Sequence, residues 1–118
     1  MIYADNAATT KISDTAFHKM LPFLREQYGN PSSLYSFGAK AKRAIENARK
    51  QVAVAIGARP SEIFFTSSGS ESNNWALRGV AESFSAEKIH MITSSIEHPS
   101  VLNHCRALEE KGIEMTYL

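Results

Sequence analysis

The sequence has 118 residues, of which 43% are hydrophobic and 21% charged, and its net charge is +1. That length is sufficient for a small domain with a core, and the near-neutral charge gives no reason to expect nucleic acid or an anionic membrane as a direct partner. No apolar run approaches the ~20 residues that a membrane span needs. The N-terminus lacks the pattern of a signal peptide, and a single cysteine cannot form an internal disulfide. We therefore expect a cytoplasmic protein.

The first half of the chain has two helical patterns. Apolar residues on one face predict a helix over about 14–28, with Ser13 or Asp14 as its N-cap and a kink or early break at Pro22. A longer stripe at three- and four-residue steps predicts a helix over 36–57 that Gly57 ends.

The second half alternates between strands and helices. We expect strands over 62–66, 88–93 and 113–118, with helices over 71–84 and from 98 to Gly112 between them. This order implies an α/β fold with a mainly parallel sheet, right-handed crossovers and helices on both faces. Three parallel strands leave sheet edges uncovered, so we expect the chain to be the first, incomplete part of a larger protein.

A loop of small residues from Thr66 to Glu71 follows the first predicted strand and opens into a helix. Backbone N–H groups at a helix start lack intrahelical partners, which suits a phosphate; Gly69 allows close approach and Ser70 adds a hydroxyl. The spacing fits neither a P-loop nor a dinucleotide fingerprint. The alternative is an ordinary turn rich in capping residues.

A second polar loop, 95–100, follows the next predicted strand and contains His98. Loops after consecutive parallel strands meet at one sheet edge, where ligands bind in open α/β folds. His98 could stack on a flat ligand or move a proton there. The alternative is a helix-capping or surface histidine.

Other candidates are weaker. The turn-prone stretches 5–10 and 30–33 are loop chemistry when taken alone. His104 and Cys105 are neighbours and point about 100° apart on a helix, so we expect no metal site with His98. Cys105 falls on an apolar stripe and is expected to be a small core residue.

Four motifs stand in order along the chain: Tyr3-Ala4-Asp5-Asn6-Ala7-Ala8-Thr9-Thr10, Gly29-Asn30-Pro31-Ser32-Ser33, Phe65-Thr66-Ser67 with Glu71-Ser72-Asn73-Asn74, and Glu97-His98-Pro99. Taken together, they resemble the N-terminal part of cysteine desulfurases, within the class V aminotransferase group of fold-type I pyridoxal-phosphate enzymes. The resemblance runs from Met1 to Leu118 and covers about the first third of a family member. It implies that 1–118 is the N-terminal part of the large transferase domain, with residues 1 to about 15 packing against a small domain outside this sequence.

The resemblance also implies a cofactor, pyridoxal 5′-phosphate. In such enzymes the residues matching Gly69 and Ser70 bind its phosphate, and the residue matching His98 stacks on its ring and assists proton transfers. The family converts L-cysteine to L-alanine. The sulfur passes as a persulfide to acceptor or scaffold proteins for iron–sulfur clusters or tRNA thiolation, and the full-length enzymes are homodimers.

The sequence departs from the family pattern in several places. Ser70 stands where threonine is usual, and Tyr35 where many members have histidine. The family's cofactor-bearing lysine follows a Ser-x-His pattern, which His18-Lys19 does not match, and Cys105 does not match the sulfur-accepting cysteine. We therefore expect the chain alone to be inactive and to bind the cofactor weakly at best. The alternatives are a fragment of a selenocysteine lyase or another class V enzyme, or a non-catalytic remnant that binds a full-length homologue.

Overall fold

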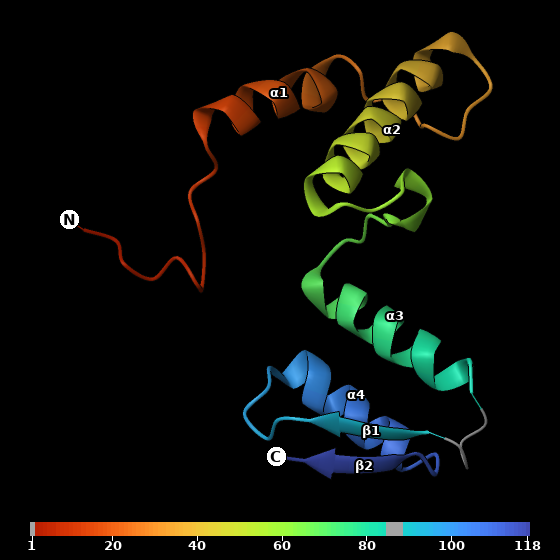
Figure 1. The fold of residues 1–118 in the computed structure, drawn as a ribbon. Helices are drawn as coiled ribbons and strands as arrows, with labels where there is room; N and C mark the ends of the chain where they lie inside the picture. The colour runs from red at the N-terminus through yellow and green to blue at the C-terminus, as the bar shows by residue number, and fades with distance from the viewer. Residues whose placement is uncertain (1, 85–88) are drawn as a thin grey trace. The chain divides into compact units, whose positions relative to one another are not determined.

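The computed structural model describes residues 2–84 and 89–118, which form two compact units (Figure 1). The first unit ends at Phe64 and the second begins at Phe65. Within the described residues, no helix combines the length and hydrophobicity that crossing a membrane requires.

The first unit contains helices α1 (Asp14–Arg25) and α2 (Ser36–Ile56). Ser13 is the N-cap of α1: its hydroxyl accepts a hydrogen bond from the Ala16 N–H at 3.2 Å, as the sequence predicted. Pro22 lies inside α1, and the helix ends at Arg25, three residues before the predicted end. Helix α2 matches its prediction, and it stops because Gly57 takes a left-handed conformation with φ of 69°.

The predicted strand over 62–66 is wrong. A 3-10 helix, η1 (Pro60–Glu62), occupies its start, and Ile63 is extended without belonging to a strand. The boundary between the two units falls inside this segment, after Phe64. A strand exists only as part of a hydrogen-bonded ladder. Within the described residues the only ladder joins two other segments, so the predicted three-stranded sheet has two strands here.

The second unit contains α3 (Gly69–Glu82), β1 (His90–Thr93), α4 (Pro99–Glu109) and β2 (Glu114–Tyr117). The two strands are parallel, with His90 opposite Glu114 and Thr93 opposite Tyr117. Their parallel pairing confirms the prediction from the strand–helix–strand order. Lys88, the first residue of the strand predicted over 88–93, lies outside the described residues.

The core of the second unit lies between α3, α4 and one face of the sheet. Ala81, Leu108 and Ile113 are buried at its centre, and four half-buried side chains surround them: Leu77, Ile89, Met91 and Met115. The other face of β1 carries Ile92, which is 63% exposed. Within the second unit, α3 and α4 thus cover one face of this sheet, whereas the sequence predicted helices on both faces of the larger, incomplete sheet.

The parallel ladder continues past the ends of the strands. The Leu118 N–H donates to the Thr93 carbonyl at 2.8 Å, and the Ser95 N–H donates to the Leu118 carbonyl at 2.7 Å. The polar loop after β1 therefore leaves the sheet beside the C-terminal end of β2, and it leads directly into α4.

Candidate functional site

The start of α3 has two backbone donors that the helix does not use. Ser68 is the N-cap, and it accepts hydrogen bonds from the Glu71 N–H through its hydroxyl at 3.2 Å and from the Ser72 N–H through its carbonyl at 3.1 Å. Within the described residues, the N–H groups of Gly69 and Ser70 make no hydrogen bond. These two groups lie at the positive end of the helix dipole, which favours an anion.

The loop before α3 is braced by its own side chains. The Thr66 hydroxyl donates to the Ser68 carbonyl at 3.0 Å and lies 2.6 Å from the Ser72 hydroxyl. The Glu71 carboxylate accepts from both the hydroxyl and the backbone N–H of Ser67, each at 2.7 Å. These bonds hold the pKa of Glu71 below its usual value, the Ser67 hydroxyl contributing most. The carboxylate is thereby bound to the residue that precedes the cap.

A methyl group built at Gly69 would meet no heavy atom within 4 Å in the described part of the chain. The backbone of Gly69 is also not in the left-handed region. Neither packing nor conformation therefore requires glycine at this position. A requirement for glycine here would have to come from something that approaches the backbone from outside.

The start of α4 is closed by its own residues. His98 is the N-cap, and its Nδ1 accepts a hydrogen bond from the Ser100 N–H at 3.1 Å and lies 2.9 Å from the Ser100 hydroxyl. Pro99 has no N–H, and the N–H groups of Val101 and Leu102 donate to the His98 carbonyl. His98 is thus a helix-capping histidine, which was the alternative reading of the sequence.

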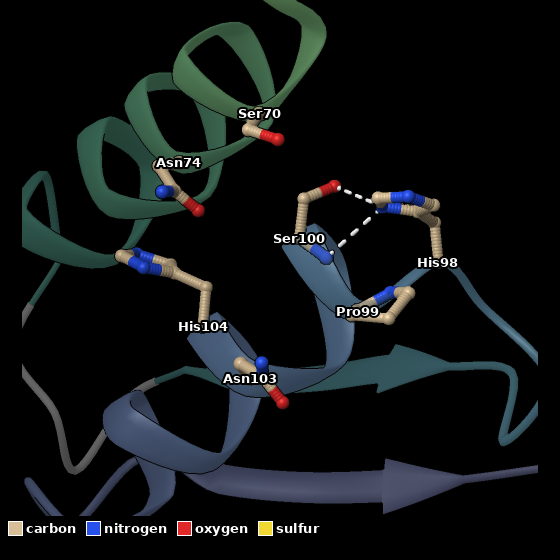
Figure 2. Close-up of a pocket in the computed structure, with 7 residues that line it drawn as sticks. All are labelled: Ser70, Asn74, His98, Pro99, Ser100, Asn103 and His104. Atoms are coloured by element: carbon tan, nitrogen blue, oxygen red, sulfur yellow. Dashed lines mark hydrogen bonds between the residues drawn. The ribbon is translucent and has the colours of Figure 1, made fainter.

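His98 also lines an open cavity of about 400 Å³ with Ser70 (Figure 2). Gly69 precedes Ser70 at the helix start but is not among the lining residues. The structure thus brings two of the three predicted site residues to one cavity and places the third beside them. The lining residues include no lysine or arginine, so an anion here would be met by backbone N–H groups and hydroxyls. The residues that line the cavity are Ser70, Asn74, His98, Pro99, Ser100, Asn103 and His104.

Asn74, Asn103 and His104 were not predicted as site residues. Helical spacing could have found them, because Asn74 lies one turn after Ser70 on α3, and Asn103 and His104 lie one turn after Pro99 and Ser100 on α4. A residue that opens a helix at a binding site places the residue four positions later on the same face.

Cys105 is buried, with 1% of its surface exposed, which confirms its prediction as a small core residue. Burial raises the pKa of its thiol, and the negative charge of Glu97 adds to this. The thiol is therefore poorly suited to act as a nucleophile. Within the described residues, no three histidine, cysteine, aspartate or glutamate side chains gather closely enough to hold a metal ion.

The chain matches a known protein family over nearly its whole length. The family model for aminotransferase class-V matches residues 2–118. The chain belongs to the aminotransferase class-V family. Over 117 residues it is 50% identical to the cysteine desulfurases IscS of Dictyoglomus turgidum and of Methanosarcina thermophila, and each match covers 99% of this chain.

Two solved structures are similar to this chain in both fold and sequence. A NifS-like protein superposes with a TM-score of 0.90 at 46% identity over 97% of this chain, and SspA in complex with cysteine with a TM-score of 0.89 at 46% identity over 98%. This class-V chain therefore has the α/β fold of the N-terminal part of such proteins, as predicted. It spans 30% and 29% of the lengths of the two IscS relatives and 31% and 33% of the two solved chains.

Proposed function

We propose that this chain forms the part of a pyridoxal-phosphate-dependent cysteine desulfurase that holds the cofactor's phosphate and one face of its ring. The observation that carries the proposal is the cavity shared by the open start of α3, at Ser70, and the His98 side chain. Its support from relatives is the 50% identity to cysteine desulfurases over nearly the whole chain.

The residues fit the cofactor at both ends. The N–H groups of Gly69 and Ser70 and the Ser70 hydroxyl would bind the phosphate, with the helix dipole favouring its charge. The free space around Gly69 leaves its backbone accessible to a phosphate oxygen. The His98 ring, which the α4 cap orients, would pack against the pyridine ring.

When bound, pyridoxal phosphate supplies the electron sink for chemistry at the α-carbon of an amino acid. His98 is the residue of this chain that we propose to take part in proton transfers. The braced loop from Thr66 to Glu71 keeps the phosphate-binding donors in place before the ligand arrives. The proposed substrate is L-cysteine, and the related SspA has a solved structure in complex with cysteine.

The wider setting of the reaction is also a proposal. Following the resemblance, the complete enzyme would be a cytoplasmic homodimer. It would pass sulfur as a persulfide to an acceptor or scaffold protein, for iron–sulfur clusters or tRNA thiolation. Residues 1 to about 15 would pack against the enzyme's small domain.

Activity of a chimaera tests the proposal. Residues 1–118 would be joined to the remaining part of the Dictyoglomus turgidum relative, which is 50% identical over the segment replaced. We expect the chimaera to release alanine and sulfide from L-cysteine. The 118-residue chain alone, with cofactor added, should release neither, because its sequence lacks the lysine and cysteine motifs of the family.

A well-folded, dimeric chimaera that binds pyridoxal phosphate but leaves L-cysteine unchanged would contradict the proposed reaction. Turnover by the 118-residue chain alone would contradict the proposed division of labour. The same relative without the replacement is the matched control for both measurements.

A further inference from the structure

A chain of hydrogen bonds runs from α3 to the His98 ring through Ser100. The Asn73 Nδ2 amide donates to the Ser100 hydroxyl at 2.9 Å, and this bond links α3 to α4 through two residues 27 positions apart in sequence. The Ser100 hydroxyl lies 2.9 Å from His98 Nδ1, and the Ser100 backbone N–H donates to the same nitrogen at 3.1 Å. Asn73 and Ser100 are both half-buried, whereas His98 is exposed.

The backbone donor decides the direction of every bond in this chain. A backbone N–H can only donate, so His98 Nδ1 must carry no proton. The Ser100 hydroxyl can then only donate in its contact with Nδ1, where it shares the lone pair with the backbone N–H, and its oxygen accepts from the Asn73 amide. The neutral ring therefore carries its proton on Nε2.

We infer that Asn73 and Ser100 are positioning residues that hold His98 in one orientation and one tautomer, with Nδ1 occupied and Nε2–H available. The inference rests on the proposed function for its meaning in catalysis, but the hydrogen-bond geometry stands without it. Ser100 lines the cavity and Asn73 does not, and both hold His98 through the hydrogen-bonded chain.

This arrangement limits what His98 can do with protons. Nε2 already carries a proton, so in this state it donates a hydrogen bond and cannot accept a proton. Uptake of a proton must occur at Nδ1, and a ring protonated on both nitrogens can accept neither bond from Ser100. Proton uptake by His98 is thus coupled to loss of the cap bond from the Ser100 N–H, whereas the Ser100 hydroxyl oxygen can accept from Nδ1–H and still accept from Asn73.

The His18 ring provides an internal reference of opposite type. Its Nδ1 lies 2.6 Å from the carbonyl oxygen of Asp14, which can only accept, so His18 carries its proton on Nδ1. The structure thus assigns opposite tautomers to two histidines of one chain. An unfolded chain would give all its histidines the same tautomer pattern.

Nuclear magnetic resonance of the ¹⁵N-histidine-labelled 118-residue chain, at a pH where histidine is neutral, tests this assignment. Long-range ¹H–¹⁵N correlations should show the Nε2–H form at His98 and the Nδ1–H form at His18. With uniform ¹⁵N labelling, a coupling across the hydrogen bond should join the Ser100 amide nitrogen to His98 Nδ1. The same form at both rings, or no coupling at Ser100, would overturn the inference.

Variants separate the positioning role from general packing. Ser100→Ala and Asn73→Ala should each shift the Nδ1 resonance of His98, the former more, because it removes a direct donor. Ser100→Thr keeps a hydroxyl and should restore the wild-type shift. Asn103→Ala is the matched control, since Asn103 lines the same cavity outside this hydrogen-bonded chain.

Equal shifts in Asn73→Ala and Asn103→Ala would assign the effect to the cavity in general and refute a role for Asn73. The readouts need no cofactor. The two proposals can fail separately. If the NMR shows the predicted tautomers but the chimaera does not act on L-cysteine, the positioning of His98 stands and only its catalytic meaning is lost.

Discussion

The starts of α3 and α4 border one cavity and differ in how they use their backbone N–H groups (Figure 2). At the start of α4, proline removes one donor and His98 accepts from the next three residues. At the start of α3, Ser68 accepts from Glu71 and Ser72, but the N–H groups of Gly69 and Ser70 stay available within the described residues.

This difference shows that a helix N-terminus is not in itself an anion site. Both helices carry the same dipole, but only α3 presents free donors beside a residue without a side chain. The closed start of α4 has a different use, because its cap is an imidazole. Under the proposed function, the start of α3 would bind the phosphate, and the start of α4 would orient the His98 ring beside it.

Replacement of His98 by asparagine should separate these two roles of the α4 cap, with the largest expected effect. Asparagine is a good N-cap, so the stability of the chimaera should stay within ~0.5 kcal/mol of the parent. Its turnover of L-cysteine should fall about 10²- to 10⁴-fold, the usual contribution of a proton-transferring side chain. Urea unfolding and alanine release measure the two effects.

His98→Ala is the matched control, because it removes both the cap and the ring. It should lose the same activity and also ~1 kcal/mol of stability. An active His98→Asn variant would show that the imidazole matters only as a cap.

Sequence reasoning predicted this part of the molecule well because its signals are local. Pro99 suits the first turn of α4, Gly57 suits the end of α2, and the order of elements implied parallel pairing of β1 and β2. It also predicted that Ser70 and His98 lie near each other, and both line one cavity, although the strand predicted before Ser70 does not form in the described residues. The two helix ends need only the neighbours of each residue along the chain, and the parallel pairing needs only the order of the elements.

The errors came where a residue depends on partners distant in sequence. The apolar run at 62–66 has strand composition, but strand formation needs a ladder, which the described residues do not supply there. The link from Asn73 to Ser100 joins two helices, and no local pattern reveals it. For His98, the sequence offers helix capping and ligand binding as alternatives, whereas one side chain both caps α4 and lines the cavity.

The open start of α3 should distinguish ligands by their phosphate. We expect pyridoxamine 5′-phosphate, which lacks the reactive aldehyde, to bind the chain weakly but more tightly than pyridoxamine. The largest amide shifts should fall on Gly69 and Ser70. Ser70→Asp should weaken binding at least about fivefold, since two like charges 4 Å apart repel by about 1 kcal/mol even in water.

The same Ser70→Asp change should stabilise α3 by about 0.3–1 kcal/mol, because an acidic side chain complements the helix start. Weaker binding could not then be attributed to unfolding. Ser61→Asp, in η1 of the other unit, adds the same charge and should leave binding unchanged. Equal affinity for the two ligands would argue against a phosphate site at α3.

The smallest expected effect is a pH dependence confined to the α3 start. The hydrogen bonds from Ser67 lower the pKa of Glu71 in the folded chain. A lowered folded pKa means that the carboxylate stabilises the fold above its unfolded value of about 4.3. This stabilisation is lost as the pH falls through the folded pKa.

Amide hydrogen exchange at Ser67 and Ser72 should therefore speed up in the wild-type chain as the pH falls through the lowered pKa of Glu71. Glu71→Gln removes the titrating group, so its exchange, corrected for the intrinsic effect of pH, should show no such step. The Ser67 amide resonance should move with the same midpoint, since the Ser67 N–H donates a hydrogen bond to the Glu71 carboxylate. A step that persists in Glu71→Gln would mean that another group braces the loop, and the open start of α3 would then owe its shape to something other than Glu71.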